Sequence, residues 1–200
     1  MRFNCAMAVK RITLLIPGST AKALEAHITK AREAEKAWIA AEIENGRDRK
    51  SARREAIELR PSRWPTQDVL VVRAVERRLD REDLAGPWEP LTPKEAGGMR
   101  LAGRWPGPDE GNLVAERQFG LPEALVERLR TASWRVSADW LKLLEEEDLI
   151  GRPLDGHERE RRDELAAHLM SPPRIVRQAL AAPFALVWRP LARSTPAVRK

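Results

Sequence analysis

Residues 86–111 are too rich in glycine and proline to form a regular helix or a central strand. This stretch of 26 residues holds six glycines and five prolines. Proline lacks a backbone N–H and clashes with the preceding helical turn, so it interrupts helices and strand ladders alike. Loops of this length are unusual inside a compact domain. We therefore predict a linker or functional loop here, which separates a first half (1–85) from a second half (112–188) and a basic tail (189–200).

Both halves are predicted to be mainly helical, so the expected fold class is mostly α with one or two short strands. Residues 20–44 hold eight alanines and no glycine or proline, a composition of high helix propensity. Their apolar residues recur at helical spacing and form one stripe, which includes Leu24, Ile28, Trp38 and Ile43. A helix this long needs a partner along it, which is either another helix of the chain or a second copy of the chain.

Capping and helix-breaking residues set the ends of the predicted elements. Ser19 or Thr20 is expected to cap the long helix, and the pair Asn45-Gly46 to end it. Pro61 is expected to interrupt the chain after a second helix, and Ser137 to begin a new helix in the second half. The other predictions are strands at 11–16, 112–122 and 184–188, and helices at 47–59, 67–84, 122–134, 157–170 and 173–182.

The chain is basic, with a formal net charge of +6 and a pI of about 10.0. Residues 1–85 carry 18 basic and 13 acidic side chains, whereas residues 86–188 carry 14 basic and 17 acidic ones. A basic balance favours acidic partners such as nucleic acid. The alternative is a soluble protein whose average charge happens to be positive.

Five cations lie close together in the second predicted helix: Arg47, Arg49, Lys50, Arg53 and Arg54. Asp48 is the only acid among them. Residues three and four apart share a helix face, so these side chains can follow a phosphate backbone and release its counterions. We expect them, helped by Arg11 and the tail, to bind DNA or RNA. The alternative is a solvated helix face that Glu55 and Glu58 neutralise.

Two tryptophans, Trp64 and Trp105, stand in the same tripeptide, RWP. Beside an arginine in a loop, a tryptophan ring can stack on unpaired bases. Tryptophan in a proline-containing segment more often anchors the loop to the core by burying a large area. We expect anchoring, with stacking on nucleic acid as the alternative.

A different class of function is a helical protein–protein interaction or scaffold protein. Such a protein would dimerise through the long alanine-rich helix, and its basic residues would only provide solubility. The contact residues would be Leu24, Ile28, Trp38 and Ile43.

Two segments, KRITLLIP (10–17) and ERQFGLPEALVERL (116–129), resemble the opening of ribbon-helix-helix DNA-binding proteins. In that family two chains pair their strands, and the resulting ribbon enters the major groove. The resemblance implies a remote alternative function, DNA binding by such a ribbon. It implies that Ile12, Leu14 and Ile16 face inward, whereas Arg11, Thr13, Glu116 and Gln118 face the DNA.

The chain departs from that family at two points. Its first predicted helix continues through residue 44, well beyond the place where the family turns, and phosphates would repel Glu116. The same two segments also allow another interpretation, an internal repeat of a strand leading into an amphipathic helix. The register of such a repeat drifts after the first helix.

The sequence offers no recognisable catalytic constellation. His27, His157 and His168 lack metal-ligand spacing, and LLIPGSTAK lacks the glycine pattern of a phosphate-binding loop. No serine or cysteine stands in a known nucleophile motif. We therefore expect a non-enzymatic protein with no cofactor and no metal.

Cysteine content and hydropathy bear on the cellular location. Cys5 is the single cysteine and has no partner for an internal disulfide, which fits a reducing compartment. No apolar run reaches the length needed to span a bilayer. The expected location is the cytoplasm, without a membrane partner.

Overall fold

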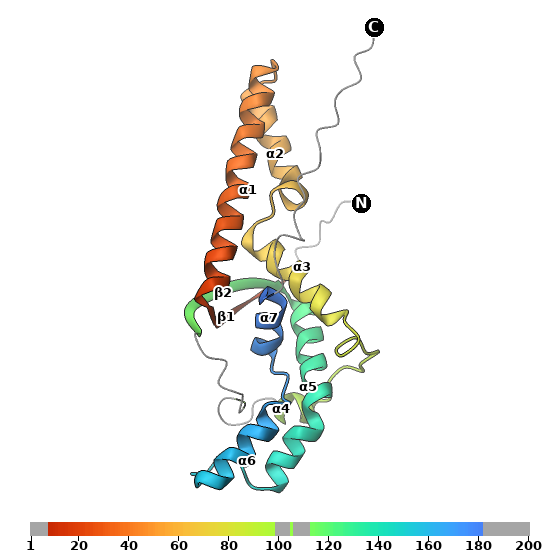
Figure 1. Ribbon diagram of the computed structural model, residues 1–200. Coiled ribbons are helices and arrows are strands. Elements are labelled where there is room, and N and C mark those ends of the chain that lie inside the picture. Colours follow the sequence, from red (N-terminus) through yellow and green to blue (C-terminus); the bar gives the residue numbers. More distant parts are fainter. Residues whose placement is uncertain (1–7, 99–104, 106–112, 182–200) are drawn as a thin grey trace.

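A computed structural model describes residues 8–98, 105 and 113–181, and the structural statements below concern these residues. Helices dominate and the two strands form one antiparallel sheet, which confirms the mostly-α prediction. Figure 1 shows an elongated molecule with the sheet near its middle. In chain order the elements are β1 (Val9–Pro17), α1 (Gly18–Glu44), α2 (Arg49–Arg63), α3 (Gln67–Leu79), α4 (Pro93–Gly98), β2 (Leu113–Pro122), α5 (Glu123–Glu146), α6 (Gly156–Ala166) and α7 (Pro172–Ala181).

The two strands pair with each other although they belong to different halves of the chain. Thr13 lies opposite Gln118 at the centre of the pairing, and Val9 lies opposite Pro122 at one end. Successive side chains point to opposite faces of the sheet. Leu14, Ile16, Phe119 and Leu121 are buried on the inner face, with Ile12 partly buried beside them, whereas Arg11, Thr13, Glu116 and Gln118 are exposed on the outer face. These side chains therefore point inward and outward as the resemblance to ribbon-helix-helix proteins predicted.

One hydrophobic core joins the two halves of the chain. It takes Leu24 from α1, Leu70 from α3, Leu129 from α5 and Ile175 from α7, each of them at most 2% exposed. Phe119 of β2 belongs to the same cluster. The two predicted halves follow each other in the sequence, but residues of both halves form the sheet and the core.

The chain folds as two repeats, each made of one strand and three helices. The first repeat is β1, α1, α2 and α3, and the second is β2, α5, α6 and α7. In the strands, the hairpin turns and the last helices, adding 105 to a residue number in the first repeat gives its counterpart in the second. Pro17 and Pro122 both end strands, and Gly46 and Gly151 both adopt a left-handed backbone, with φ of 87° and 82°. Glycine suits both places because it has no Cβ to clash there.

The equivalence extends to the last helix of each repeat. Thr66 caps α3, and Ser171 occupies the same place before α7. The sequence indicated that the register of the repeat drifts after the first helix, and this drift is local. Asp48 and Asp155, the N-caps of α2 and α6, are 107 residues apart instead of 105, whereas Thr66 and Ser171 are again 105 apart. Four of the five buried residues of α3 (Leu70, Val71, Ala74 and Val75) correspond one by one to those of α7 (Ile175, Val176, Ala179 and Leu180). The fifth, Leu79, has its counterpart at position 184, outside the described residues.

An approximate two-fold axis relates the two repeats. The antiparallel register places this axis between Thr13 and Gln118, which are themselves counterparts. Figure 1 shows the α1–α2 hairpin extending from one side of the sheet and the α5–α6 hairpin from the other. α3 and α7 pack against each other between the hairpins.

The helix boundaries expected at the first strand and at Pro61 were wrong. α1 follows β1 without a turn and has Pro17 at its N-cap, so neither Ser19 nor Thr20 caps it. Proline suits this junction because its φ is already compatible with both neighbours. α2 continues through Pro61 to Arg63.

The expected helix start at Ser137 was also wrong, because α5 passes through it without a break. The Ser137 hydroxyl is fully buried and accepts a hydrogen bond from the backbone N–H of Met170 at 2.9 Å. A serine that finds such a tertiary partner no longer competes with the helix backbone. Ser137 therefore fixes the second hairpin instead of starting a helix.

The glycine- and proline-rich stretch contains one short helix, α4, contrary to the expectation of no regular helix. Thr92 and Glu95 form a reciprocal cap at its start, with N···O distances of 2.7 and 3.3 Å. Arg135 of α5 holds the Glu95 carboxylate. Together with the Thr92 N–H, Arg135 lowers the pKa of Glu95 to about 2. The remainder of the stretch, apart from residues 86–92 and Trp105, lies outside the described residues, as do 184–188 and the basic tail.

We expect Phe119→Ala to destabilise the whole chain in one cooperative transition. The ring is fully buried in the shared core, and truncation of a buried phenylalanine costs about 3–5 kcal/mol. Val114→Ala is the matched control on the same strand, because Val114 is 73% exposed, and its effect should stay within about 0.5 kcal/mol. Urea unfolding monitored by circular dichroism measures both. Two separate transitions, with one repeat unaffected, would contradict a shared core.

Candidate nucleic-acid interface

The basic helix α2 packs against α1 through small residues. Ala52 and Ala56 of α2 are fully buried, and Ala31 of α1 is 2% exposed. The rings of Trp38 and Trp64 lie 5.4 Å apart at the sheet-proximal part of the hairpin. This packing turns the opposite face of α2 toward the surroundings.

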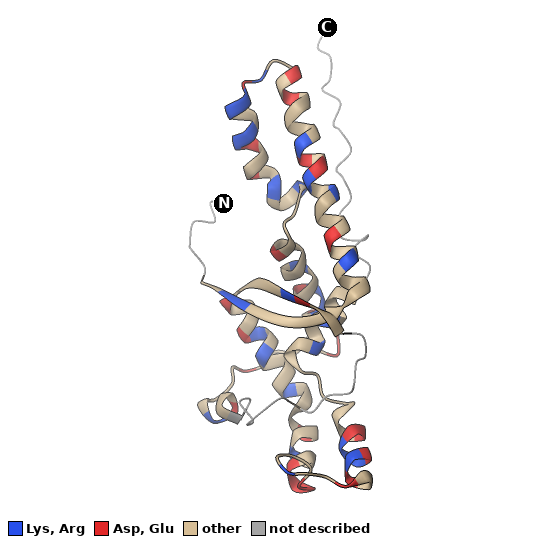
Figure 2. Cartoon of the chain, turned by 90° about the vertical axis from the view of Figure 1, so that its left-hand side faces the viewer, with Lys and Arg blue, Asp and Glu red and all other residues tan. Residues whose placement is uncertain are grey.

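The outward face of α2 carries four cations without a carboxylate partner among the described residues. They are Arg49, Lys50, Arg53 and Arg54, all exposed. Ile57, on the same face, is 60% exposed. Figure 2 shows the basic residues gathered at the end of α2 that follows the hairpin turn.

The other two cations predicted to bind nucleic acid lie elsewhere or are paired. Arg47 forms ion pairs with Glu42 (3.3 Å) and with Glu55. It closes the hairpin turn and is not a free member of the cationic face. Arg11 lies on the outer face of the sheet, where its guanidinium donates to the Gln118 side chain at 3.0 Å. The predicted set therefore divides between two surfaces.

Asp48 immediately precedes the cationic face, and its carboxylate serves the helix as N-cap. It accepts hydrogen bonds from the backbone N–H groups of Lys50 (2.8 Å) and Ser51 (3.2 Å). The pKa of Asp48 lies below its ordinary value, because the Ser51 side chain and these N–H groups bond the charged form and Arg54 adds a favourable charge. The carboxylate is thus used as a cap of α2 at the edge of a positive surface.

The equivalent helix of the second repeat, α6, provides an internal comparison. Its arginines are engaged within the protein: Arg159 donates to the Leu154 carbonyl, Arg161 pairs with Glu147 and Glu164, and Arg162 pairs with Asp163. Arg152, the counterpart of Arg47, pairs with Asp148 and Glu158. Two hairpins of the same design therefore differ in whether their cations are neutralised.

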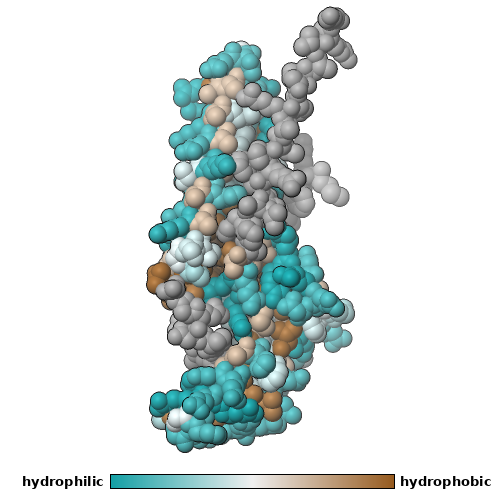
Figure 3. Space-filling view, viewed as in Figure 1, coloured by the Kyte–Doolittle hydropathy of each residue, from teal (hydrophilic) through white to brown (hydrophobic). Residues whose placement is uncertain are grey.

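The outer face of the sheet is a second polar surface. Arg11 and Thr13 of β1 lie beside Gln118 and Glu116 of β2. Val9 and Val114 stand at the ends of the strands and are 62% and 73% exposed. Figure 3, viewed as Figure 1, shows that hydrophilic residues dominate this side of the molecule and that hydrophobic ones form small separate groups. The sheet thus offers a ribbon of polar groups between two aliphatic ends, with Leu15, which is 36% exposed, among the polar groups opposite Glu116.

α3 fixes the free edge of β2. The side-chain amide of Gln67 donates to the Gln118 carbonyl at 3.1 Å, and Asp68 accepts from the Gly120 N–H at 3.0 Å. A Cβ on Gly120 would come within 3.0 Å of Asp68, so only glycine fits without a shift. These bonds satisfy backbone groups that an edge strand would otherwise leave open.

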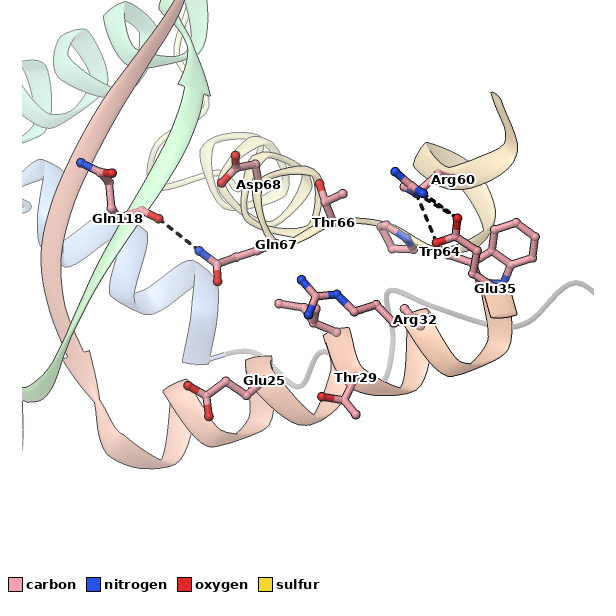
Figure 4. A pocket seen from close by; sticks show the side chains of 13 residues that line it. Glu25, Thr29, Arg32, Glu35, Arg60, Trp64, Thr66, Gln67, Asp68 and Gln118 are labelled. Carbon is pink, nitrogen blue, oxygen red and sulfur yellow. Dashed lines mark hydrogen bonds and ion pairs between the residues drawn. The ribbon is translucent and has the colours of Figure 1, made fainter. Parts of the chain in front are cut away.

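A cleft of about 670 Å³ lies between α1, the α2–α3 connection and β2 (Figure 4). Its carboxylates are already engaged: Glu35 pairs with Arg60 at 2.7 Å, and Glu25 pairs with Arg117. Trp64 and Ile28 contribute apolar lining. The polar groups of the cleft hold α1, α2 and β2 together, and we assign no ligand to it.

Both predicted stacking residues are packed against other tryptophans. Trp64 is 6% exposed, which leaves no room for a base on its ring, so the stacking alternative is wrong for this residue. Trp105 is partly buried and lies 6.5 Å from the ring of Trp134. Both arrangements are those of tryptophans that anchor a segment.

The apolar stripe of α1 finds partners within the chain. Leu24 is 1% exposed in the shared core, so it is not available as a dimer contact. Ile28 packs on the same core, and Trp38 packs on Trp64. Ile43 remains 38% exposed at the far end of the helix. The length of α1 therefore does not require a second copy of the chain.

The described residues contain no group of three or more His, Cys, Asp or Glu that could hold a metal ion. His168 instead stacks on Trp140, with ring centroids 4.1 Å apart. Within the same part of the chain, no helix is both long and apolar enough to cross a membrane.

Comparisons with models of protein families, with curated proteins and with solved structures found no match for this chain. The function must therefore be argued from the two surfaces themselves. Sequence reasoning found the basic helix but missed that the two strands form one ribbon. The available signal was the constant spacing of 105 between Pro17 and Pro122 and between Gly46 and Gly151.

We expect Asp48→Ala to lower the midpoint of urea unfolding at neutral pH, because it removes the cap of α2. Asp48→Asn keeps a capping side chain and should keep most of the midpoint. A carboxylate with a lowered folded-state pKa stabilises the protein above its unfolded pKa, and this contribution is lost as the pH falls through the folded value. The difference between the original protein and Asp48→Ala should therefore shrink in acid. An equal loss in Asp48→Asn at neutral pH would contradict the role of the cap.

Proposed function

We propose that the chain is a non-enzymatic nucleic-acid-binding protein that contacts phosphates through α2. The supporting observation is that Arg49, Lys50, Arg53 and Arg54 share an exposed face without carboxylate partners among the described residues. The corresponding helix of the second repeat has its arginines engaged internally. A cationic surface that persists in one repeat while its counterpart is neutralised is well suited to an external polyanion.

Phosphate binding by this face follows from its geometry. Arg49 and Arg53 stand one helical turn apart, and so do Lys50 and Arg54, which makes two short parallel rows of charge. Guanidinium groups match phosphate oxygens with paired N–H donors. Each phosphate that is neutralised releases condensed counterions, so the affinity depends on salt.

We expect Arg53→Glu/Arg54→Glu to weaken binding to a labelled DNA duplex and to flatten its salt dependence. Each lost phosphate contact should reduce the slope of log affinity against log salt by about 0.9, hence by nearly 2 for the pair. Fluorescence anisotropy between about 50 and 200 mM salt measures the slope. The original protein should show steep salt dependence.

The matched control is Lys36→Glu/Lys94→Glu, which changes the net charge equally at exposed positions of α1 and α4. It should leave the salt slope close to that of the original protein. An equal effect of both double variants would indicate attraction by net charge alone. No binding at low salt by the original protein would refute the proposed function.

A second candidate is recognition of duplex DNA by the outer face of the sheet, as the ribbon-helix-helix resemblance implies. The observation that favours it is the antiparallel pairing of β1 with β2, which exposes Arg11, Thr13, Glu116 and Gln118 on one face. A two-stranded antiparallel ribbon fits the major groove. Glutamine pairs with adenine there through two hydrogen bonds, and arginine pairs with guanine in the same way. In this candidate α2 supplies affinity and the ribbon supplies sequence preference.

We expect Thr13→Ala/Gln118→Ala to remove sequence preference while retaining salt-dependent binding. One good contact to a base edge is worth about 1–3 kcal/mol of discrimination. Competition between a selected duplex and random duplex measures the preference, with the exposed Thr29→Ala as the control on α1. An unchanged preference would exclude the ribbon as the reading surface.

A further inference from the structure

The two halves of the ribbon share one register from Val9 to Ile16 but differ in chemistry, and the register shifts between Ile16 and Pro17. The approximate two-fold axis between Thr13 and Gln118 exchanges β1 and β2. This axis makes Glu116 the counterpart of Arg11, and Gly120 the counterpart of Leu15. The two residues beside the axis, Thr13 and Gln118, also differ in type.

The exposed residue types near the two ends of the ribbon, by contrast, are alike. Val9 and Val114 are counterparts, and both are exposed, at 62% and 73%. The divergence is therefore confined to the central positions, where the strands lie side by side. On the outer face, one half of the centre carries a cation and the other half an anion.

A covalent link between the strands permits this difference. When two identical chains form a ribbon, the two halves must carry the same side chains, and their operator tends to be an inverted repeat. Here both strands belong to one chain, so each half is free to carry its own residues. The base sequence that such a ribbon prefers depends on the side chains of its outer face.

We propose that the ribbon reads a duplex DNA site that is not an inverted repeat, and that Arg11 and Glu116 set the direction in which the protein lies on it. This inference rests on the second candidate under the proposed function. Arg11 favours guanine in its half of the site, through O6 and N7. Glu116 accepts from the amino group of cytosine in the other half and disfavours the bases that present only acceptors.

The sharpest test makes the central polar positions of the face symmetric, with Leu15 and Gly120 left as they are. Thr13→Gln/Glu116→Arg gives both halves arginine and glutamine at their central positions. Both side chains are exposed, and neither takes part in the core or in an ion pair of the described residues, so the fold should persist. Glu33→Arg/Thr29→Gln makes the same changes on the exposed face of α1 and serves as the control.

The full-length chain and both variants are incubated with a library of random DNA duplexes, and the bound fraction is sequenced. The original protein and the control should select a site whose halves differ, with about a tenfold preference over its symmetrised version. The symmetric variant should reverse this preference and select an inverted repeat.

The outcomes separate this inference from the proposed function. An inverted repeat selected by the original protein would overturn the inference while supporting the ribbon as a DNA-binding surface. Salt-dependent binding without any selected sequence would overturn both the inference and the second candidate, but leave phosphate binding by α2 intact. Absence of binding at low salt would overturn the proposed function together with the inference.

Discussion

The pairing of β1 with β2 is the interaction on which the rest of the fold depends. A two-stranded sheet is only marginally stable alone and needs helices packed on one of its faces. Phe119, Leu121 and Ile16 supply that apolar face, and α3 and α7 contribute the core beneath it. Ion pairs tie each strand to the helix of the other repeat, Lys10 to Glu123 and Arg117 to Glu25. Neither repeat buries its strand without the other, so we infer that the two fold together.

The repeats keep their packing residues and differ in their charges. Four buried positions of α3 match the four of α7, because both helices meet the same sheet and each other. Among the described residues, α2 and α6 contribute nothing to the shared core, so their surfaces are free to diverge. Surface ion pairs such as Arg161–Glu147 contribute little to stability. Their main effect in α6 is to cancel a field that α2 retains.

Much of the fold was predictable from periodicity, because α1, α3, α7 and both strands have apolar residues at regular spacing. The errors occurred where a tertiary partner overruled a local preference. Ser137 has the chemistry of a helix cap but bonds Met170 from inside α5, and Trp64 stands in a loop sequence but is covered by Trp38. Of the candidate site, the cations of α2 were predicted, whereas the ion pairs of Arg47 depend on carboxylates brought near by folding. The ribbon was not predicted as a unit, since no local signal shows which strand pairs with which.

On both pairs of equivalent surfaces, the first repeat is more positively charged than the second. The first repeat is cationic at the end of α2 and at Arg11, while the second has neutralised arginines on α6 and a carboxylate at Glu116. The whole sequence follows the same division, with 18 basic and 13 acidic residues in 1–85 against 14 and 17 in 86–188. A field of this kind acts beyond contact distance and orients an approaching polyanion before any hydrogen bond forms. Under the proposed function, the first repeat would make the early encounter, and the asymmetry of the ribbon would then act on a duplex that is already oriented.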